Sequence, residues 1–232
     1  MTEILLIRTG QNEQELLNWL IYSPQEQEII ASGELPNAEH LSELSERALT
    51  REVVVLLPSD QVQLKTVALP TKWNRKLEQA LPYMLEEDIA FVEHNLSVYR
   101  ILPDALLLPL ADDGAVTAIE LNNQWLFKQG QWHIGAVESS WLNGYLTAMG
   151  NPDIKHFSPA SQFPESVNLQ AQTSEYDLPL ALFAKQLDSV KFNLRQGMYQ
   201  LKKQSSLWWG YWKGAAIIAS VALVSTITIK AI

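Results

Sequence analysis

The residues that could carry out chemistry are few in this chain and lie far apart. The sequence contains no cysteine, and its histidines are spread along it: His40, His94, His133 and His156. A zinc site needs several ligands at short, regular spacings such as HExxH, and no such spacing occurs in the sequence. We therefore expect the histidines to be structural or surface residues, and we expect no metal site.

A phosphate-binding or nucleophile site has equally little support. Enzymes that bind nucleotide phosphates bring glycine backbone N–H groups close to the anion and use an acidic residue to hold magnesium. The nearest candidate, Asp112-Asp113-Gly114, has one glycine, and the stretch Arg8-Thr9-Gly10-Gln11 has no aspartate. The motifs GxxxxGK[ST] and GxSxG do not occur. We interpret Asp112-Asp113-Gly114 as a turn and expect no catalytic residue and no bound cofactor.

Three consecutive acidic residues, Glu86, Glu87 and Asp88, lie within one turn of a predicted helix. Apolar residues recur at helical spacing over residues 72–91, and Pro82 should kink this helix or start a new one. Such an acidic turn is either a solvated helix face or a docking point for Arg or Lys of a partner protein. The residues alone leave both interpretations open.

The elements that must position these residues follow an α/β plan. Short β-type runs at residues 4–7, 16–22 and 28–31 predict an antiparallel meander, and a helix is expected over 38–49. The β-branched run at 53–57 is typical of a buried central strand. A half-buried strand is expected at 61–67.

The same plan recurs further along the chain. Three more strands are predicted at 115–121, 125–128 and 132–136, with turns at Asn122-Asn123 and Gln129-Gly130, followed by a helix over 138–149. Residues 151–176 are polar and predict an irregular segment, and a short helix is expected at 178–187. The order indicates an α/β, actin-like (RNase H-like) duplicated cytoplasmic domain over residues 1–184, with halves at about 1–96 and 97–184.

The end of the chain predicts a membrane anchor. Residues 208–229 are apolar apart from a lysine, serines and threonines, and a helix of this length spans about 33 Å, enough for the hydrocarbon core. The tryptophans predict an interfacial belt, and the ammonium group of the lysine can reach the headgroups. The residues expected to form the anchor include Trp208, Trp209, Trp212, Lys213, Ile217, Leu223 and Ile229.

Charge predicts the orientation of this anchor. Residues 185–213 carry six basic residues and one acid, whereas residues 1–184 have a net charge of about −15. The positive-inside rule then predicts a single-pass protein with its N-terminus in the cytoplasm and a basic juxtamembrane stalk at 185–207. An acidic domain disfavours nucleic acid and favours a basic protein partner.

Four stretches together resemble the type II secretion system protein L (GspL) family. They are VVVLLPSDQVQLKTVALP (53–70), LEQALPYMLEEDIA (77–90), RILPDALLLPL (100–110) and KFNLRQGMYQLKK (191–203). The resemblance implies a bacterial inner-membrane protein whose actin-like domain is a non-catalytic scaffold. It also implies recruitment of the secretion ATPase, type II secretion protein E, pairing with type II secretion protein M, contact with inner-membrane lipid, and assembly as a homo-oligomer.

Two departures from the family pattern lead to further expectations. Members of the family usually continue past the anchor into a periplasmic domain, whereas this sequence stops at Ile232. Residues 91–96 run almost directly into 97–103, where the family pattern leads us to expect more strands and a helix. We therefore expect an internal deletion and an incomplete domain.

Two other classes of function remain as alternatives. The first is a membrane-anchored, actin-like ATPase or sugar-kinase-like enzyme, which magnesium-dependent ATP binding would reveal. The second is a membrane-bound sensor that binds a small ligand in residues 151–176, although no cluster of polar residues there supports it.

Overall fold

The computed structural model describes residues 2–62, 64, 96–111, 114–157, 172–173 and 178–195. The chain divides into two compact units, Met1–Gly197 and Met198–Ile232. All described residues belong to the first unit, so the predicted anchor at 208–229 lies outside them. In the described part, no helix is both long and apolar enough to span a membrane.

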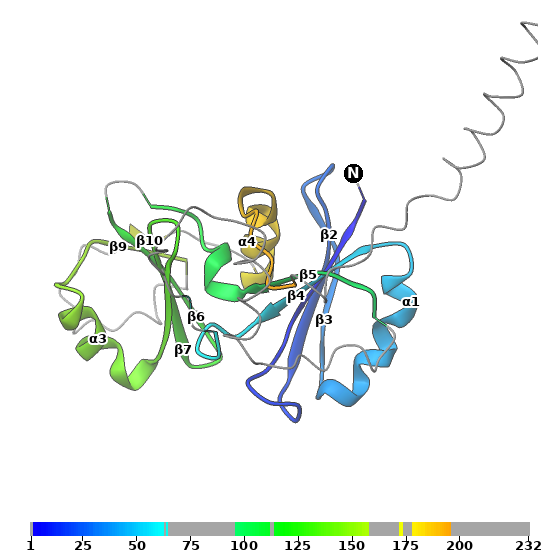
Figure 1. Cartoon of the computed structure of the whole chain (residues 1–232), viewed down its shortest axis with the longest axis horizontal. Coiled ribbons are helices and arrows are strands. Elements are labelled where there is room, and N and C mark those ends of the chain that lie inside the picture. The colour runs from blue at the N-terminus through cyan, green and yellow to red at the C-terminus, as the bar shows by residue number, and fades with distance from the viewer. Residues whose placement is uncertain are drawn as a thin grey trace, which may run out of the picture. The chain divides into compact units, whose positions relative to one another are not determined.

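The first unit contains two five-stranded mixed sheets (Figure 1). The first sheet has the order β3-β2-β1-β4-β5. Its strands are β1 (Ile4–Arg8), β2 (Leu17–Ser23), β3 (Glu28–Leu35), β4 (Glu52–Leu57) and β5 (Val98–Pro103). The β1–β2 and β2–β3 pairs are antiparallel, and the β1–β4 and β4–β5 pairs are parallel. The predicted meander and the predicted buried strand at 53–57 are thus confirmed.

The second sheet repeats this topology strand for strand. Its order is β10-β9-β6-β7-β8, with β6 (Val116–Leu121), β7 (Gln124–Gln129), β8 (His133–Glu138), β9 (Ile154–His156) and β10 (Gln172–Thr173). The β6–β7 and β7–β8 pairs are antiparallel, and the β6–β9 and β9–β10 pairs are parallel. The first strand of each sheet is therefore central, with a meander on one side and two parallel strands on the other.

Each sheet has helical turns between its third and fourth strands. In the first sheet these are the 3₁₀ helix η1 (Ala38–Leu44) and α1 (Ser45–Ala48), and in the second they are η5 (Ser139–Trp141) and α3 (Leu142–Ala148). The helix expected at 38–49 is therefore mostly 3₁₀, and its first turn is capped by Asn37, whose side chain accepts from the Glu39 N–H.

Three more helical turns complete the described part: η4 (Asp104–Leu107), α4 (Pro179–Gln186) and η7 (Leu187–Ser189). The helix α4 confirms the prediction at 178–187. Its proline at the first position has no N–H to leave unpaired, which suits the start of a helix.

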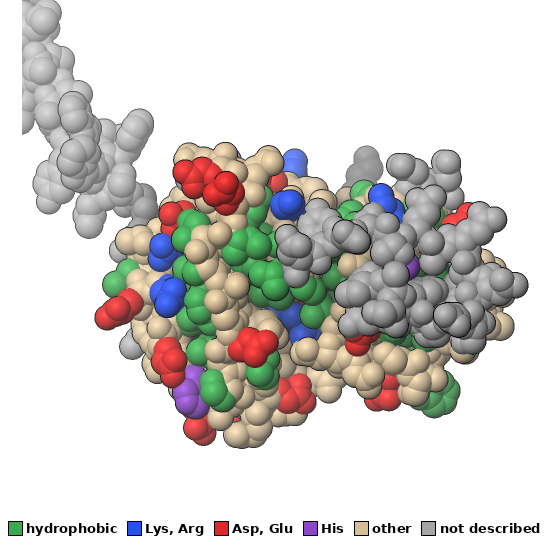
Figure 2. All heavy atoms as spheres, turned by 180° about the vertical axis from the view of Figure 1, so that it is seen from behind, with side chains coloured by type: hydrophobic (Ala, Val, Ile, Leu, Met, Phe, Trp, Pro, Cys, Tyr) green, Lys and Arg blue, Asp and Glu red, His purple; other side chains and the backbone are tan. Residues whose placement is uncertain are grey.

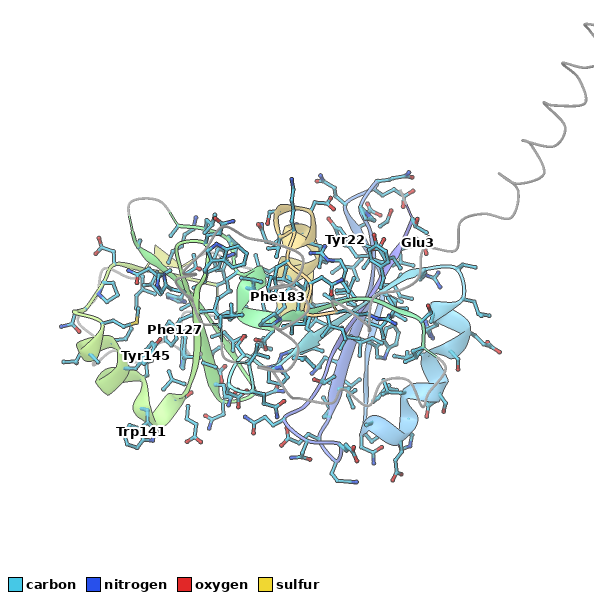
Figure 3. The ribbon with its side chains drawn as sticks, in the orientation of Figure 1. Glu3, Tyr22, Phe127, Trp141, Tyr145 and Phe183 are labelled. Atoms are coloured by element: carbon cyan, nitrogen blue, oxygen red, sulfur yellow. The ribbon has the colours of Figure 1, made fainter. Side chains whose placement is uncertain are left out.

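The apolar side chains of the described residues form three cores. The central core joins both sheets through η4 and α4 and includes Leu6, Leu126 and Phe183. The second core lies between the other face of the first sheet and η1, and the third lies between the other face of the second sheet and α3. Figure 3 shows Phe183 between the sheets and Phe127 with Tyr145 in the core near α3. Since Ile4 to Ile7 of β1 are apolar and face two cores, the strand is buried on both sides.

Several expectations need correction. The segment 151–176, predicted to be irregular, contains β9 and β10, which supply the two parallel strands of the second sheet. Strands of three and two residues are too short to show a sequence period. Gln61 and Val62, expected in a strand, are not in one. The predicted helix at 72–91 lies outside the described residues.

The strand β5 connects the two expected halves. It begins at Val98, beyond the boundary expected at residue 96, yet it pairs with β4 in the first sheet. The chain then enters η4 and the second sheet, so the two sheets belong to one compact unit.

Candidate functional site

The three parallel strands of the first sheet bring polar residues to one edge. Arg8 is the last residue of β1, Ser59 follows β4, and Asp104 follows β5 directly. In α/β sheets, ligands commonly bind in the crevice at the carboxyl ends of the strands. This edge is therefore the place where an enzyme of this architecture would hold a ligand.

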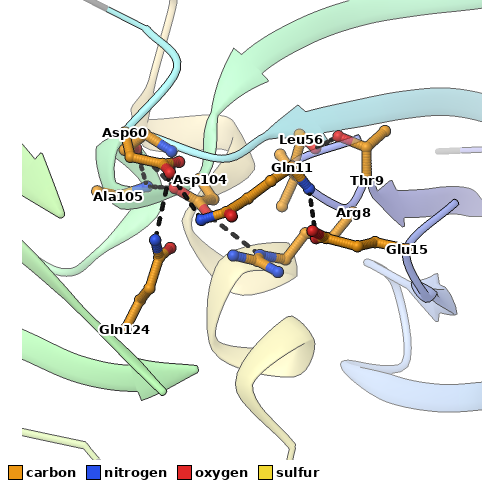
Figure 4. Close-up of polar contacts among 10 residues, drawn as sticks. Arg8, Thr9, Gln11, Glu15, Leu56, Asp60, Asp104, Ala105 and Gln124 are labelled. Atoms are coloured by element: carbon orange, nitrogen blue, oxygen red, sulfur yellow. Dashed lines mark hydrogen bonds and ion pairs between the residues drawn. The ribbon is translucent and has the colours of Figure 1, made fainter. Parts of the chain in front are cut away.

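A buried carboxylate lies at the centre of this edge. Asp104 is fully buried and Arg8 is 3% exposed, and the Arg8 Nε donates to Asp104 Oδ2 over 2.9 Å. Asp104 Oδ1 accepts from the Ser59 N–H, the Ser59 hydroxyl and the Ala105 N–H, at 3.0, 2.6 and 2.7 Å. Figure 4 shows these contacts between the ends of the strands. Both oxygens of the carboxylate are thus used by the protein itself.

Burial raises the pKa of Asp104, and the Arg8 charge with the Ser59 and Ala105 hydrogen bonds opposes that rise. A buried ion pair is stable only when hydrogen bonds satisfy its remaining polar atoms, and the contacts of Asp104 meet that condition. The cluster of Arg8, Ser59 and Asp104 therefore connects the ends of β1, β4 and β5. Its polar groups bind one another and are not directed at a ligand.

A second, exposed contact lies beside this cluster. Asp60 Oδ2 accepts from Gln11 Nε2 at 2.8 Å and from Gln124 Nε2 at 3.2 Å (Figure 4). Gln11 belongs to the β1–β2 connection and Gln124 begins β7. Asp60 therefore links the first sheet to the second.

A buried lysine forms another link between the sheets. Lys128 of β7 is 5% exposed, and its Nζ donates to the carbonyls of Leu106 and Leu108 at 2.6 and 2.8 Å. Burial lowers the pKa of Lys128 to about 8. Carbonyls at the end of a helix have no N–H partner within the helix. The Lys128 amine donates to such carbonyls at the end of η4, so its role is structural.

The outer edge of β5 is covered by the chain that follows η7. The Leu194 N–H donates to the Ile101 carbonyl at 2.9 Å, and the Ile101 N–H donates to Asn193 Oδ1 at 3.1 Å. The Arg195 guanidinium donates to the Val98 carbonyl. A stalk was expected at residues 185–207. Its first part, as far as Arg195, is instead packed on the first sheet.

Arg100 of β5 holds the same segment from the other side. Its guanidinium donates to the Leu187 carbonyl at 3.0 Å, to the Phe192 carbonyl at 3.1 Å, and to the Val190 carbonyl. Burial lowers the pKa of Arg100, and the nearby Glu52 carboxylate opposes this. The side chains of Arg100 and Glu52 line a shallow hollow together with Asp188.

Most residues singled out from the sequence lie outside the described part. These are Glu86, Glu87, Asp88, His94, Asp112, Asp113 and every expected residue of the anchor. Gly114 has a φ of +78°, which suits a turn. In the described residues, no group of three or more histidine, aspartate or glutamate side chains could hold a metal ion.

The described histidines are well separated. His40 Nδ1 lies 2.8 Å from Asn37 Oδ1, His133 is exposed, and His156 is buried beside Trp125. They therefore do not form a common site.

Sequence reasoning missed the buried pair of Arg8 and Asp104. In the sequence, Asp104 is part of the stretch 100–110 that resembles the family, and Arg8 belongs to the stretch 8–11, which has no aspartate. A signal was present, because an aspartate directly after an apolar run can mark the end of a buried strand. Its partner could not be identified, since Arg8 is 96 residues away in the chain.

Comparison with known proteins gives one consistent family. Residues 5–93 and 91–202 match the family described as "Type II secretion system (T2SS), protein L". The two matched segments meet at residues 91–93, where the sequence suggested an internal deletion.

The chain is similar to curated proteins that carry the name "Type II secretion system protein L", including the three that follow. The protein of Vibrio cholerae serotype O1 is 27% identical over 268 residues, covering 98% of this chain and 66% of its own length. Those of Pectobacterium carotovorum and Dickeya chrysanthemi are each 28% identical, covering 92% and 84% of this chain and 60% and 56% of their own lengths. The chain therefore spans between about half and two thirds of these relatives.

The alignment with the Vibrio cholerae relative also bears on the deletion. It runs over 268 residues, whereas this chain has 232. The relative therefore has residues within the aligned region that this chain lacks, in agreement with an internal deletion.

One solved structure is similar over most of the chain. It is the cytoplasmic domain of EpsL, described as an inner membrane component of the type II secretion system of Vibrio cholerae. The TM-score is 0.71 at 26% identity, and the match covers 86% of this chain and all of that one. The mixed α/β fold is therefore similar to that of the EpsL domain.

Proposed function

The chain belongs to the type II secretion system protein L family, and from this membership we propose that it is an inner-membrane scaffold that tethers the cytoplasmic secretion ATPase. The observation that carries the proposal is the family match, which extends from residue 5 to residue 202. The proposed partners are type II secretion protein E, which is the ATPase, type II secretion protein M, further copies of this chain, and inner-membrane lipid.

A non-catalytic role is supported by the strand ends of the first sheet. The position at which a ligand would bind is filled by the Arg8 and Asp104 side chains, whose contacts are made within the protein. An enzyme would need polar groups directed at an open crevice. The rival is an anchored, actin-like ATPase or sugar-kinase-like enzyme, and calorimetric titration with ATP and magnesium separates the two: heat of binding at micromolar ATP would favour the enzyme.

The finer fold assignment is part of the proposal. We take the domain to be a duplicated, actin-like domain, because both sheets have the same strand order and strand directions. Each repeat also places its helical turns between the third and fourth strands. In this assignment the two sheets together form a rigid platform, the part of the chain over residues 1–184.

The anchor supplies the attachment to the membrane. We place it at residues 208–229, with the N-terminus in the cytoplasm and the basic residues 202, 203 and 213 next to the inner leaflet. Positively charged juxtamembrane residues are attracted to anionic lipid. The acidic domain is repelled by that lipid and can face a cytoplasmic partner.

The acids at 86–88 are the proposed docking point for the ATPase. Charged pairs across an interface speed association and fix its orientation, and several anchored copies would bind a ring-shaped ATPase more strongly than one. The acidic character of the platform favours a basic module on the partner. Figure 2 shows acidic side chains at several places on the face that it presents, with fewer basic ones.

Charge reversal tests this docking point. We expect the triple variant Glu86→Lys, Glu87→Lys, Asp88→Lys to lose at least about tenfold of its affinity for the ATPase, because like charges then oppose each other. The matched control is Glu39→Lys, Glu43→Lys, Glu46→Lys, which makes the same change in net charge on exposed residues of η1 and α1.

The measurement is co-purification of the secretion ATPase with the detergent-solubilised full chain. Recovery that falls only with the triplet at 86–88 supports docking there. Equal recovery with all three proteins would remove the triplet from the interface, and no recovery with the unaltered chain would refute the tethering proposal.

A further inference from the structure

The strand β3 is an edge of the first sheet. Its inner side pairs with β2, and no described residue pairs with its outer side. An edge strand leaves backbone N–H and C=O groups available to pair with another extended chain. The five pairs from Leu17↔Leu35 to Ile21↔Ala31 are regular, and the register shifts only beyond Ile21. The portion Ala31–Leu35 is thus a regular template.

This edge has few of the features that usually prevent pairing. Proteins protect edges with lysine, proline or bulges placed along the strand. Here the middle of β3, from Ile29 to Ser32, has no charge, and Ile29 and Ile30 are 38% and 46% exposed. The bulge leaves Ile30 as the extra residue, so the regular part of the edge is Ala31–Leu35. The outer edge can therefore accept a partner over most of its length.

The charged residues of β3 and of the chain directly before and after it are all acidic. Residues 24–37 contain Glu26, Glu28 and Glu34 and no lysine or arginine, and all three carboxylates are exposed. A second copy of this chain would bring the same acids to the interface, and like charges on paired strands are destabilising. An extended segment with lysine or arginine would instead pair with them.

We propose that the outer edge of β3 binds an extended, cationic segment of a partner protein, which adds to the first sheet as an additional strand. Backbone hydrogen bonds supply the affinity, the exposed isoleucines accept apolar side chains of the segment, and Glu28 and Glu34 select its positive charge. This surface is separate from the acids at 86–88, and the proposal does not depend on recruitment of the secretion ATPase.

Two synthetic peptides test the proposal on the detergent-solubilised full chain. The first alternates lysine with valine and can form a strand. The second has proline in place of valine, so it has the same charge but cannot pair along a strand, because proline has no N–H. We expect the valine peptide to bind at least about tenfold more tightly and to protect the amides of residues 28–35 from hydrogen exchange.

Two charge variants locate the binding. Glu28→Lys with Glu34→Lys should weaken binding of the valine peptide by at least about tenfold. The control, Glu138→Lys with Asp153→Lys, makes the same charge change on exposed residues at the end of β8 and directly before β9, and should alter binding by less than about twofold. Circular dichroism verifies that both variants remain folded.

Four results would overturn the inference. The two peptides could bind equally, which would mean attraction by charge alone. The two charge variants could weaken binding equally, or the amides of β3 could exchange at unchanged rates, which would place the peptide elsewhere. Absence of any binding by the valine peptide would also reject the proposal.

Discussion

Asp104 has no contact with solvent, and its carboxylate accepts hydrogen bonds from Arg8, Ser59 and Ala105. Removal of one partner of a buried ion pair leaves an uncompensated charge, which costs far more than the pair contributes. The pair therefore fixes the geometry at the ends of β1, β4 and β5, even though its net contribution to stability is small.

The first prediction concerns this carboxylate. Asp104→Ala should lower the free energy of unfolding by about 3–5 kcal/mol, because Arg8 is left buried without its partner. Urea unfolding followed by near-ultraviolet circular dichroism measures the change. Asp153→Ala, which removes an exposed carboxylate, is the control and should change the free energy by less than about 0.5 kcal/mol. A loss below about 1 kcal/mol for Asp104→Ala would mean that the pair does not fasten the strands.

The second prediction concerns the pH dependence of Lys128. Its pKa is lowered to about 8 in the folded protein, whereas an unfolded lysine titrates near 10.4. Between these values the unfolded state binds more protons, so the free energy of unfolding should rise with pH by up to about 1.4 kcal/mol per unit. Below pH 8 both states carry the charge, and this dependence should disappear.

Lys128→Met provides the comparison for that measurement. The difference in unfolding free energy between the unaltered chain and the variant should be constant below pH 8 and should grow between pH 8 and about 10. A difference that stays flat through this window would show that Lys128 keeps an ordinary pKa in the folded protein.

Sequence reasoning identified local features of single residues better than distant partners. The turn at Asn122-Asn123 was predicted, and both residues have the positive φ of a tight hairpin, 51° and 63°. This conformation depends on adjacent residues. The partners of Asp104 and Lys128 come from other strands, and nothing in local sequence indicates them.

At the scale of elements, the outer edge of β5 is the counterpart of the open edge of β3. It is covered by residues 193–195, which make backbone and side-chain hydrogen bonds to it. The segment that leads toward the predicted anchor therefore begins as part of the folded domain.

The third prediction tests this attachment. Asn193→Ala removes the acceptor of the Ile101 N–H. A single hydrogen bond contributes about 0.5–1.5 kcal/mol, so the Ile101 amide should exchange about 2–10 times faster. Hydrogen exchange resolved at single residues measures the rate.

The control for that prediction is Ser189→Ala, which removes a hydroxyl of η7 that donates to the Gln186 carbonyl at the end of α4. It should leave the Ile101 amide unchanged. Equal rates at Ile101 in the unaltered chain and in Asn193→Ala would show that residues 193–195 do not protect the edge.

Element types were predictable where the sequence pattern was long enough. The two meanders and α4 have apolar runs with clear boundaries, and all were expected from the sequence. The strands β9 and β10 have three and two residues, and only pairing with β6 and with each other makes them strands. The strand β5 was not predicted, and the boundary expected at about residue 96 assigned its residues to the second half.

At the scale of the whole molecule, the two sheets repeat one topology, and the charge of the chain is unevenly distributed. The repeat was expected from the order of elements, and the structure extends it to all five strands of each sheet. Residues 2–62 alone contain eleven acids and three basic residues. A domain with this charge is suited to a basic partner and is repelled by an anionic membrane surface.

We propose that this chain holds the secretion ATPase at a membrane. Flotation of lipid vesicles tests this proposal, with purified ATPase added to vesicles that carry the full chain and to vesicles without protein. We expect the ATPase to float with the vesicles that carry the chain and to stay in solution with the others. Equal amounts of ATPase on both kinds of vesicle would contradict it.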